Sequence, residues 1–296
     1  MKITSLWHTV LAAAAALALA ACGAEPEQAE GPAPSPALWM LTGDNGESAF
    51  LFGTIHSLPP GAEWRTGIID RALARSDLLV LEIAQIDDTA AIAAEFARLG
   101  QSAGHGNLSH RVSPELQDDL ALLLKQAGNR DQDFAQIESW AAALMLVQAT
   151  APADEGEGVD VALLRGNAGM EVAELEGTTD QLSRFDSLPE KEQVDLLSAV
   201  IRSAPDSEKE SERLMNSWLT GDVAAMVEET KQGLLADPEL RDALLVSRND
   251  NWLPKIEAWI RAGKKPFIAA GAAHMAGPEG LPEQLAARGW KIKRIQ

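Results

Sequence analysis

The sequence is poor in residues that many catalytic and metal sites require. Its 296 residues include one cysteine, Cys22, and no tyrosine, and aromatic residues make up only 5%. One cysteine cannot form an intrachain disulfide or supply a metal site with several thiolates. The sequence also lacks the G-x-S-x-G, P-loop and H-E-x-x-H motifs of three large enzyme classes. We therefore expect a hydrophobic core to stabilise the chain, which is long enough to bury one.

Positive charge is scarce as well. The chain has 25 Lys and Arg against 44 Asp and Glu, a net charge of −19 and a pI near 4.6. A strongly acidic surface repels phosphate groups. Nucleic acid is therefore not an expected partner, and most acidic residues are interpreted as a solvated surface.

The N-terminal region has the features of a bacterial lipoprotein signal. Residues 1–21 have a basic start and an uncharged apolar segment that is short for a membrane span, which predicts a signal peptide. The segment ends in "LAAC", so we expect lipidation of Cys22 and anchoring to a membrane surface. Residues 22–37, rich in Pro, Ala and Glu, predict a disordered tether. Gly23 favours the outer membrane, so the expected location is the periplasm-facing cell envelope.

The hydrophobic pattern predicts a single α/β domain over residues 38–296. Residues 38–56 predict two short strands joined by a turn, and residues 65–77 predict a helix. "LLVLEI", residues 78–83, predicts a strand that is covered on both faces. Strand, helix and strand in this order form a βαβ unit of a parallel sheet, and residues 264–295 repeat the order.

Helical patterns dominate the middle of the chain. Residues 86–150 and 188–262 predict helices, and "MEVAELEG", residues 170–177, predicts one more strand. We therefore expect a mostly parallel central sheet built from two similar βαβ halves, with helical insertions between them.

A repeated G-x-x-H motif follows two of the predicted strands. "FLFGTIHSLP" places His56 three residues after Gly53, and "FIAAGAAHMAG" places His274 three residues after Gly271. Glycine allows the backbone to turn at the strand end. Because the carboxyl ends of parallel strands share one edge of a sheet, both histidines are expected at one ligand-binding rim. Two such histidines suit metal binding or acid–base catalysis.

Carboxylates end two other predicted strands. Glu82 interrupts "LLVLEI", and Glu176 closes "MEVAELEG". A buried carboxylate is costly unless it is paired or bound to a cation, so both are candidates for the same rim. Asp160 in "GVDVALL" is interpreted as an ordinary acid in the first turn of a helix.

A polar cluster precedes the last predicted βαβ half. "VSRNDNW" contains Arg248 and Asn249 between apolar residues. The pair is either a polar helix turn or a set of donors that holds a carboxylate or a polarised carbonyl.

These segments together resemble a known family. "FLFGTIHSLP", "LLVLEI", "EGVDVALL", "LEGTTDQL", "RNDNW" and "GAAHMAG" occur in the order seen in the TraB/GumN family, in its bacterial lipoprotein or periplasmic branch. The resemblance covers residues 38–296. That family is similar to the Tiki metalloproteases and, in fold, to erythromycin-esterase-like and haem-binding ChaN-like proteins.

The resemblance implies an α/β core with a site made from the motif residues. The matching positions are His56 and His274 for the histidines, Glu82 and Glu176 for the acids, and Arg248 and Asn249 for the polar pair. By similarity to the Tiki branch, the first hypothesis is a metal-dependent hydrolase that cleaves a peptide or protein substrate. The histidines and one carboxylate would bind Mn, Co or Zn, and the other carboxylate would accept a proton from bound water. In this first hypothesis Arg248 or Asn249 stabilises the developing oxyanion.

Two alternative functions use the same residues. The first alternative is a non-catalytic lipoprotein whose histidines bind haem or another ligand. The second is a metal-free, esterase-like hydrolase that depends on a histidine.

Overall fold

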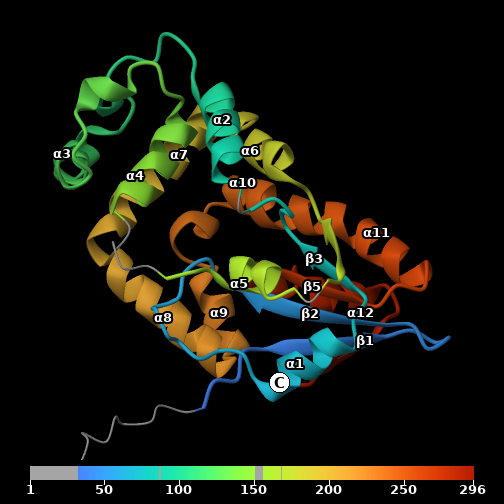
Figure 1. Ribbon diagram of the computed structural model, residues 1–296. Helices are drawn as coiled ribbons and strands as arrows, with labels where there is room; N and C mark the ends of the chain where they lie inside the picture. Colours follow the sequence, from blue (N-terminus) through green and yellow to red (C-terminus); the bar gives the residue numbers. More distant parts are fainter. Residues whose placement is uncertain (1–32, 87, 151–155, 168) are drawn as a thin grey trace, which may run out of the picture. The chain divides into compact units, whose positions relative to one another are not determined.

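A six-stranded sheet joins the beginning of the described chain to its end (Figure 1). A computed structural model describes residues 33–86, 88–150, 156–167 and 169–296, and in these ranges the strand order is β4-β3-β5-β2-β1-β6. The strands are β1 (Leu38–Thr42), β2 (Ser48–Thr54), β3 (Leu78–Leu81), β4 (Glu171–Glu174), β5 (Pro266–Gly271) and β6 (Lys291–Arg294). Strands β4, β3, β5 and β2 are parallel, whereas β1 is antiparallel to both β2 and β6. The predicted α/β class with a mostly parallel sheet is confirmed.

Two crossover connections leave the adjacent strands β2 and β5 in opposite directions. Helix α1 (Gly67–Ala74) follows β2 and leads to β3, and α12 (Leu281–Ala287) follows β5 and leads to β6. Strand β6 runs in the same direction as β5, because β1 is antiparallel to both of its neighbours. Strand β5 lies between the connected strands β2 and β3, and strands β2 and β1 lie between the connected strands β5 and β6. The point between β2 and β5 is therefore a topological switch point, where open α/β sheets bind ligands.

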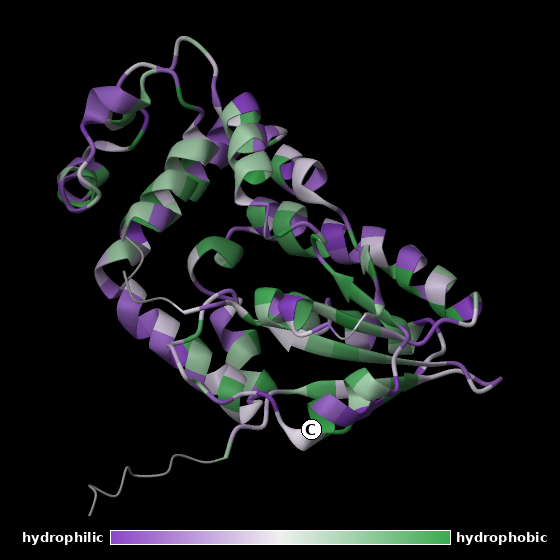
Figure 2. Ribbon diagram, viewed as in Figure 1, coloured by the Kyte–Doolittle hydropathy of each residue, from purple (hydrophilic) through white to green (hydrophobic). Residues whose placement is uncertain are grey.

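Alternating hydrophobic residues cover both faces of the central strands. Phe52 and Phe267 pack in the core on the α1 face, and Leu51 and Ile268 pack on the face of α12 and α11 (Ser247–Arg261). Figure 2 shows this concentration of hydrophobic residues in the central strands. Burying each such side chain contributes roughly 1.5–3 kcal/mol, so both faces stabilise the sheet.

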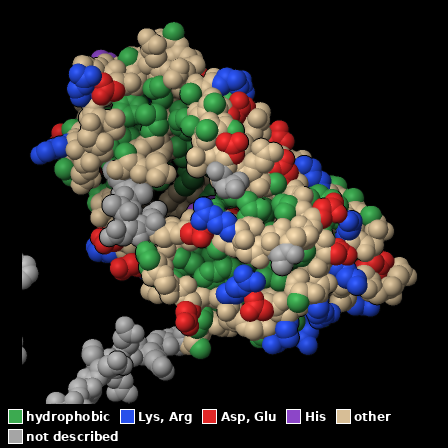
Figure 3. Space-filling view, viewed as in Figure 1, with side chains coloured by type: hydrophobic (Ala, Val, Ile, Leu, Met, Phe, Trp, Pro, Cys, Tyr) green, Lys and Arg blue, Asp and Glu red, His purple; other side chains and the backbone are tan. Residues whose placement is uncertain are grey.

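Helical segments lie between the two halves in the sequence. Those that build a further core are α2 (Thr89–Gly100), α3 (Gln117–Gln126), α4 (Ser139–Thr150), α6 (Thr178–Asp186), α7 (Glu190–Ser203) and α10 (Pro238–Arg241). Trp140 of α4 and Leu197 of α7 are fully buried in this core. Figure 3 shows hydrophobic side chains gathered in a hollow between these helices and the sheet. Helices α5 (Val159–Arg165), α8 (Ser207–Thr220) and α9 (Val223–Glu229) pack instead in the core on the α1 face of the sheet. None of the described helices is both long enough and apolar enough to span a membrane.

The predicted signal peptide (residues 1–21) and the lipidated Cys22 lie outside the described residues, as does most of the tether. The last tether residues belong instead to the folded unit, Pro34–Gln296. Ser35 N donates to Leu219 O at 2.7 Å, and Gln296 Nε2 donates to Pro36 O at 2.9 Å. The chain is thus fixed to the domain shortly before β1 begins.

Candidate functional site

The predicted site residues lie at the carboxyl edge of the parallel strands. They follow four different strands or open one helix: His56 after β2, Glu82 after β3, Glu176 after β4, His274 after β5, and Arg248 with Asn249 in the first turn of α11. The structure brings five of these residues into one hydrogen-bonded network. His56 lies apart from these bonds and pairs with another residue.

Arg248 is the centre of the buried network. Its Nη2 donates to Glu82 Oε2 at 2.5 Å and also to Glu176 Oε1, and its Nε donates to Glu176 Oε2 at 3.2 Å. Its Nη1 donates to His274 Nε2 at 3.1 Å and to Leu244 O at 3.3 Å. The guanidinium also lies over the Trp252 ring, 4.8 Å from the ring centroid. A guanidinium has five N–H groups, so these five acceptors satisfy all of them.

Asn249 is also fully engaged. Its Nδ2 donates to Glu279 O at 2.7 Å and to His274 O at 3.5 Å, and its Oδ1 accepts from His274 Nδ1 at 2.7 Å. The π-helical turn η6 (Asp242–Val246) directly precedes α11, and both Arg248 and Asn249 are buried in the first turn of α11. In this arrangement neither residue has a free N–H for the predicted oxyanion role. Both act as positioning residues for their neighbours.

His274 is a buried, neutral side chain. Arginine can only donate, so His274 Nε2 is the acceptor of the Arg248 bond and Nδ1 carries the proton given to Asn249. Burial lowers the pKa of His274 to about 3; the Glu82 charge opposes this shift, and the Arg248 charge adds to it. Both ring nitrogens of His274 are therefore occupied at neutral pH.

Glu82 is held as a carboxylate. Its Oε1 accepts from Gly271 N at 2.7 Å, and Gln181 Nε2 donates to its Oε2 at 3.3 Å. Burial alone would raise the pKa of Glu82, but its positive neighbours His274 (when protonated), Arg248 and His56, together with the Gly271 amide, lower it to about 2. The charge of Glu82 therefore persists at neutral pH.

The glycines of the two motifs do not make the turns that the sequence predicts. Gly53 lies inside β2 and Gly271 ends β5, and neither has a positive φ. A Cβ on Gly53 would lie 3.2 Å from Ala272 Cα, and a Cβ on Gly271 would lie 3.3 Å from Glu82 Oε1. The glycines thus allow close packing between neighbouring strand ends.

His56 differs from His274 because 74% of its side chain is exposed. Its Nδ1 lies 3.3 Å from Asp160 Oδ2, and Thr54 Oγ1 donates to Asp160 Oδ1 at 2.7 Å. Oδ2 is buried, and the His56 ring is the ion-pair partner that the described residues provide for it. The Asp160 carboxylate raises the pKa of His56 to about 8, against the opposing effects of partial desolvation by the surrounding rim and of the Arg248 charge. His56 Nε2 has no hydrogen-bond partner among the described residues.

Asp160 is the functional residue that the sequence interpretation underrates. It does lie in the first turn of α5, as predicted, but it is 4% exposed and paired with His56. A close backbone contact fixes this pair: Val159 N donates to Ile55 O at 3.0 Å, and a Cβ on Gly158 would lie 2.4 Å from His56 O. The sequence signal that could have identified Asp160 is its position between two valines that follow Gly158.

The donor atoms predicted to bind a metal ion face N–H groups instead. Glu82, Glu176 and His274 have suitable chemistry for Mn, Co or Zn. Arg248 donates to all three, and His56 lies outside this network. Within the described ranges, no group of three or more His, Cys, Asp or Glu side chains is arranged to hold a metal ion. In this arrangement these residues fit a guanidinium rather than a metal ion.

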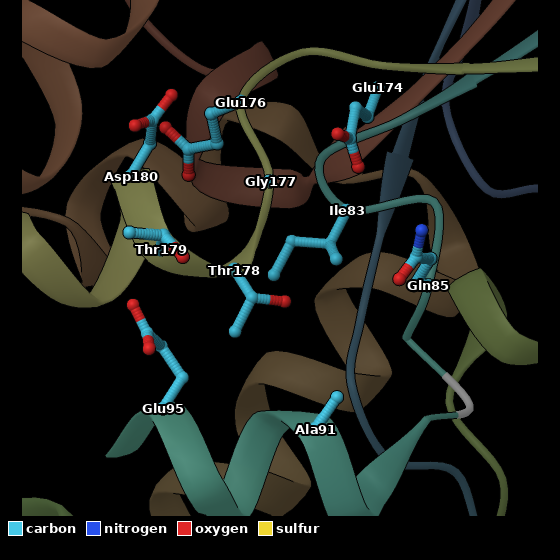
Figure 4. A pocket seen from close by; sticks show the side chains of 10 residues that line it. All are labelled: Ile83, Gln85, Ala91, Glu95, Glu174, Glu176, Gly177, Thr178, Thr179 and Asp180. Carbon is cyan, nitrogen blue, oxygen red and sulfur yellow. The ribbon is translucent and has the colours of Figure 1, made fainter. Parts of the chain in front are cut away.

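A polar cavity of about 410 Å³ opens beside Glu176 (Figure 4). It lies where β3 and β4 end and is closed on one side by α2. Figure 4 shows Glu95 of α2 pointing toward Thr178 and Thr179 of α6. Glu176 therefore separates the Arg248 network from this cavity.

One comparison with known proteins gives a match. The model of the TraB/PrgY/gumN family matches residues 37–294, which is most of the chain. No curated protein and no solved structure matches it. The family expected from the six sequence segments is thereby confirmed.

Proposed function

The chain belongs to the TraB/PrgY/gumN family, and we propose that it is a hydrolase in which His56 is the general base. One observation carries the proposal. His56 follows β2 at the switch point, its mostly exposed side chain has Nδ1 beside the buried Asp160 carboxylate, and its Nε2 has no hydrogen-bond partner among the described residues. An oriented imidazole with one free nitrogen is the arrangement that acid–base catalysis requires.

The proposed reaction uses this pair directly. Asp160 orients the ring and keeps the proton on Nδ1, so that unprotonated Nε2 takes a proton from water. The water oxygen then forms a bond to the substrate carbonyl carbon. As the tetrahedral intermediate collapses, the bond to the leaving amine or alkoxide breaks and His56 returns the proton to it. Such proton transfer typically accelerates a reaction about 10²–10⁴-fold.

We propose a peptide or protein as the substrate and the cell envelope as the location. The resemblance to the Tiki branch supports the substrate class. The signal-like residues 1–21 and the "LAAC" segment support a lipid anchor at Cys22, facing the periplasm from the outer membrane. An ester substrate requires the same base, so peptides and esters should be compared directly.

A metal-dependent peptidase is the second candidate. Its support is the residue types at the rim, where His56 and His274 lie near the carboxylates Glu82 and Glu176. It requires Arg248 to release the acceptor atoms it now holds. Haem binding has less support, because both nitrogens of His274 are engaged and, of the two motif histidines, His56 alone could be an axial ligand.

Hydrolysis by purified residues 24–296 tests the proposal. The protein is treated with chelator and assayed with fluorogenic peptide libraries and nitrophenyl esters. We expect activity to survive chelation and to fall about 10²–10⁴-fold in His56→Gln. The matched control His110→Gln, an exposed histidine of the helical region, should keep wild-type activity. Unchanged activity in His56→Gln would refute the proposal. Loss on chelation with recovery in Mn, Co or Zn would favour the second candidate.

A further inference from the structure

Glu82, Glu176 and His274 converge on a single buried cation. We propose that the Arg248 guanidinium is the resident cation of this site and takes the place of a divalent metal ion. The inference does not depend on hydrolysis, because it concerns what the rim binds.

The geometry of the acceptors matches a guanidinium. Both carboxylates share Arg248 Nη2, Glu176 also accepts from Nε, and His274 accepts from Nη1. Glu176 thus forms a bidentate pair with the planar fork, the arrangement in which arginine and carboxylate bind most strongly. The five acceptors equal the five N–H groups, so the guanidinium leaves none of its donors unpaired.

The charges of the site are already balanced without a metal ion. Two carboxylates, Glu82 and Glu176, face the Arg248 charge, and Arg184 Nε lies 3.5 Å from Glu176 Oε2. His274 is neutral because its two nitrogens are engaged as one donor and one acceptor. A divalent ion added here would leave two uncompensated positive charges in a buried site, which is unfavourable.

Arg248 also connects elements that are distant in sequence. Its partners follow β3, β4 and β5, and the residue itself lies in α11. Without the guanidinium, two buried carboxylates would face each other and require another cation. The Arg248→Ala protein should therefore contain a cavity that binds a small planar cation.

Metal analysis and thermal unfolding of the full chain, purified in detergent, test this inference. We expect wild-type protein dialysed against Mn, Co and Zn to retain no stoichiometric ion. Arg248→Ala should unfold on the order of 10 °C lower. Millimolar guanidinium chloride should raise the unfolding temperature of Arg248→Ala more than NaCl does. The matched control Arg184→Ala removes the other arginine beside Glu176 and should show no such rescue.

Three results would overturn the inference. The first is a stoichiometric ion in wild type that is lost in His274→Ala. The second is an Arg248→Ala protein that guanidinium stabilises no more than NaCl does. The third is an Arg248→Lys protein that is as stable as wild type, since lysine keeps the charge without the planar fork. Arg248→Lys also serves as the test variant if Arg248→Ala does not fold.

Discussion

His56 and His274 occupy matching positions in two G-x-x-H motifs, yet their surroundings give them different chemistry. His56 is exposed and lies beside a buried carboxylate, whereas His274 is buried between an asparagine and an arginine. The first environment raises a histidine pKa and the second lowers it. Of these two histidines, His56 therefore offers a nitrogen for proton transfer, and His274 helps to hold the rim in place.

The pH dependence of hydrolysis should follow His56. Its base form is the deprotonated one, so kcat/KM should rise about tenfold per pH unit and level off above about pH 8. Glu82 and Arg248 also face this ring, with opposite effects on its pKa.

In Asp160→Asn the midpoint of this pH profile should move down toward 6.5, the ordinary pKa of histidine. The rate should fall as well, because the amide can donate to Nδ1 and favour the wrong tautomer. A profile that is identical in both proteins would contradict the pairing.

Gly158 should be required for the position of His56. In Gly158→Ala the new Cβ would lie 2.4 Å from His56 O, so the loop must shift, at a cost of about 1–3 kcal/mol in unfolding free energy. The control Gly67→Ala meets only the flexible end of Arg71, at 3.3 Å, and should change stability by less than about 0.5 kcal/mol. Urea unfolding and the hydrolysis assay measure both effects. Equal behaviour of the two variants would argue against a close contact at Gly158.

The sequence predicted which residues gather at the rim better than it predicted their roles. Glu82 and Glu176 stand out because charges are unusual at the ends of apolar strands. Asp160 does not stand out, because an acid in the first turn of a helix is common. The saturation of Arg248 depends on acceptors from three other segments, which no local pattern contains.

At the scale of elements, helix α8 supports the end of β2. Trp218 Nε1 donates to Gly53 O at 2.7 Å, and the indole is fully buried beside Phe52. This bond ties α8 to a backbone carbonyl near the end of β2, next to the switch point. The helical insertion therefore contributes to the placement of His56.

Trp218→Phe should affect both stability and activity. The variant keeps most of the aromatic packing but loses the bond to Gly53 O, at a cost of about 0.5–1.5 kcal/mol. The control Trp290→Phe loses a comparable bond, from Nε1 to Glu257 Oε1 at 2.9 Å, on the other side of the sheet. Activity should fall in Trp218→Phe and persist in Trp290→Phe. The reverse order of activities would contradict a supporting role for α8.

The strands themselves were predictable, but their order was not. Continuous apolar runs identify β2, β3 and β5 as buried strands. Such runs do not specify neighbours, and the insertion of β5 between β3 and β2 depends on packing across the whole sheet. The G-x-x-H motif after a strand in each half indicated that both histidines share one rim. It did not show that a strand of one half lies between two strands of the other half.

At the scale of the whole molecule, the buried network links stability to pH. The folded protein keeps His274 neutral down to a pKa of about 3, whereas the unfolded chain binds a proton near the ordinary value of 6.5. The unfolded state thus holds more protons between these values, and stability rises with pH across this window. His56 contributes to the pH dependence of stability with the opposite sign. Its pair with Asp160 stabilises the folded state fully below pH 6.5, and this contribution is lost as pH rises through about 8.

Mild acid should therefore destabilise the protein before most carboxylates titrate. The unfolding free energy of wild type should decrease as pH falls from 6.5 toward 5, because the unfolded state gains the His274 proton. His274→Gln should be less stable at pH 7 but should show a flatter dependence in this window. Urea unfolding at several pH values compares them, with His110→Gln as the control. A wild-type stability that is constant over this window would contradict a buried neutral His274.

The most direct test of the account is a nuclear magnetic resonance titration of the histidine imidazoles in the wild-type protein. We predict that His56 titrates near pH 8 and that His274 stays neutral, with its proton on Nδ1, throughout the range in which the protein is folded. Assignment by His56→Gln and His274→Gln identifies the two signals. Two histidines that titrate together near 6.5, or a His274 signal that shifts on addition of zinc, would contradict the distinction on which the proposed function rests.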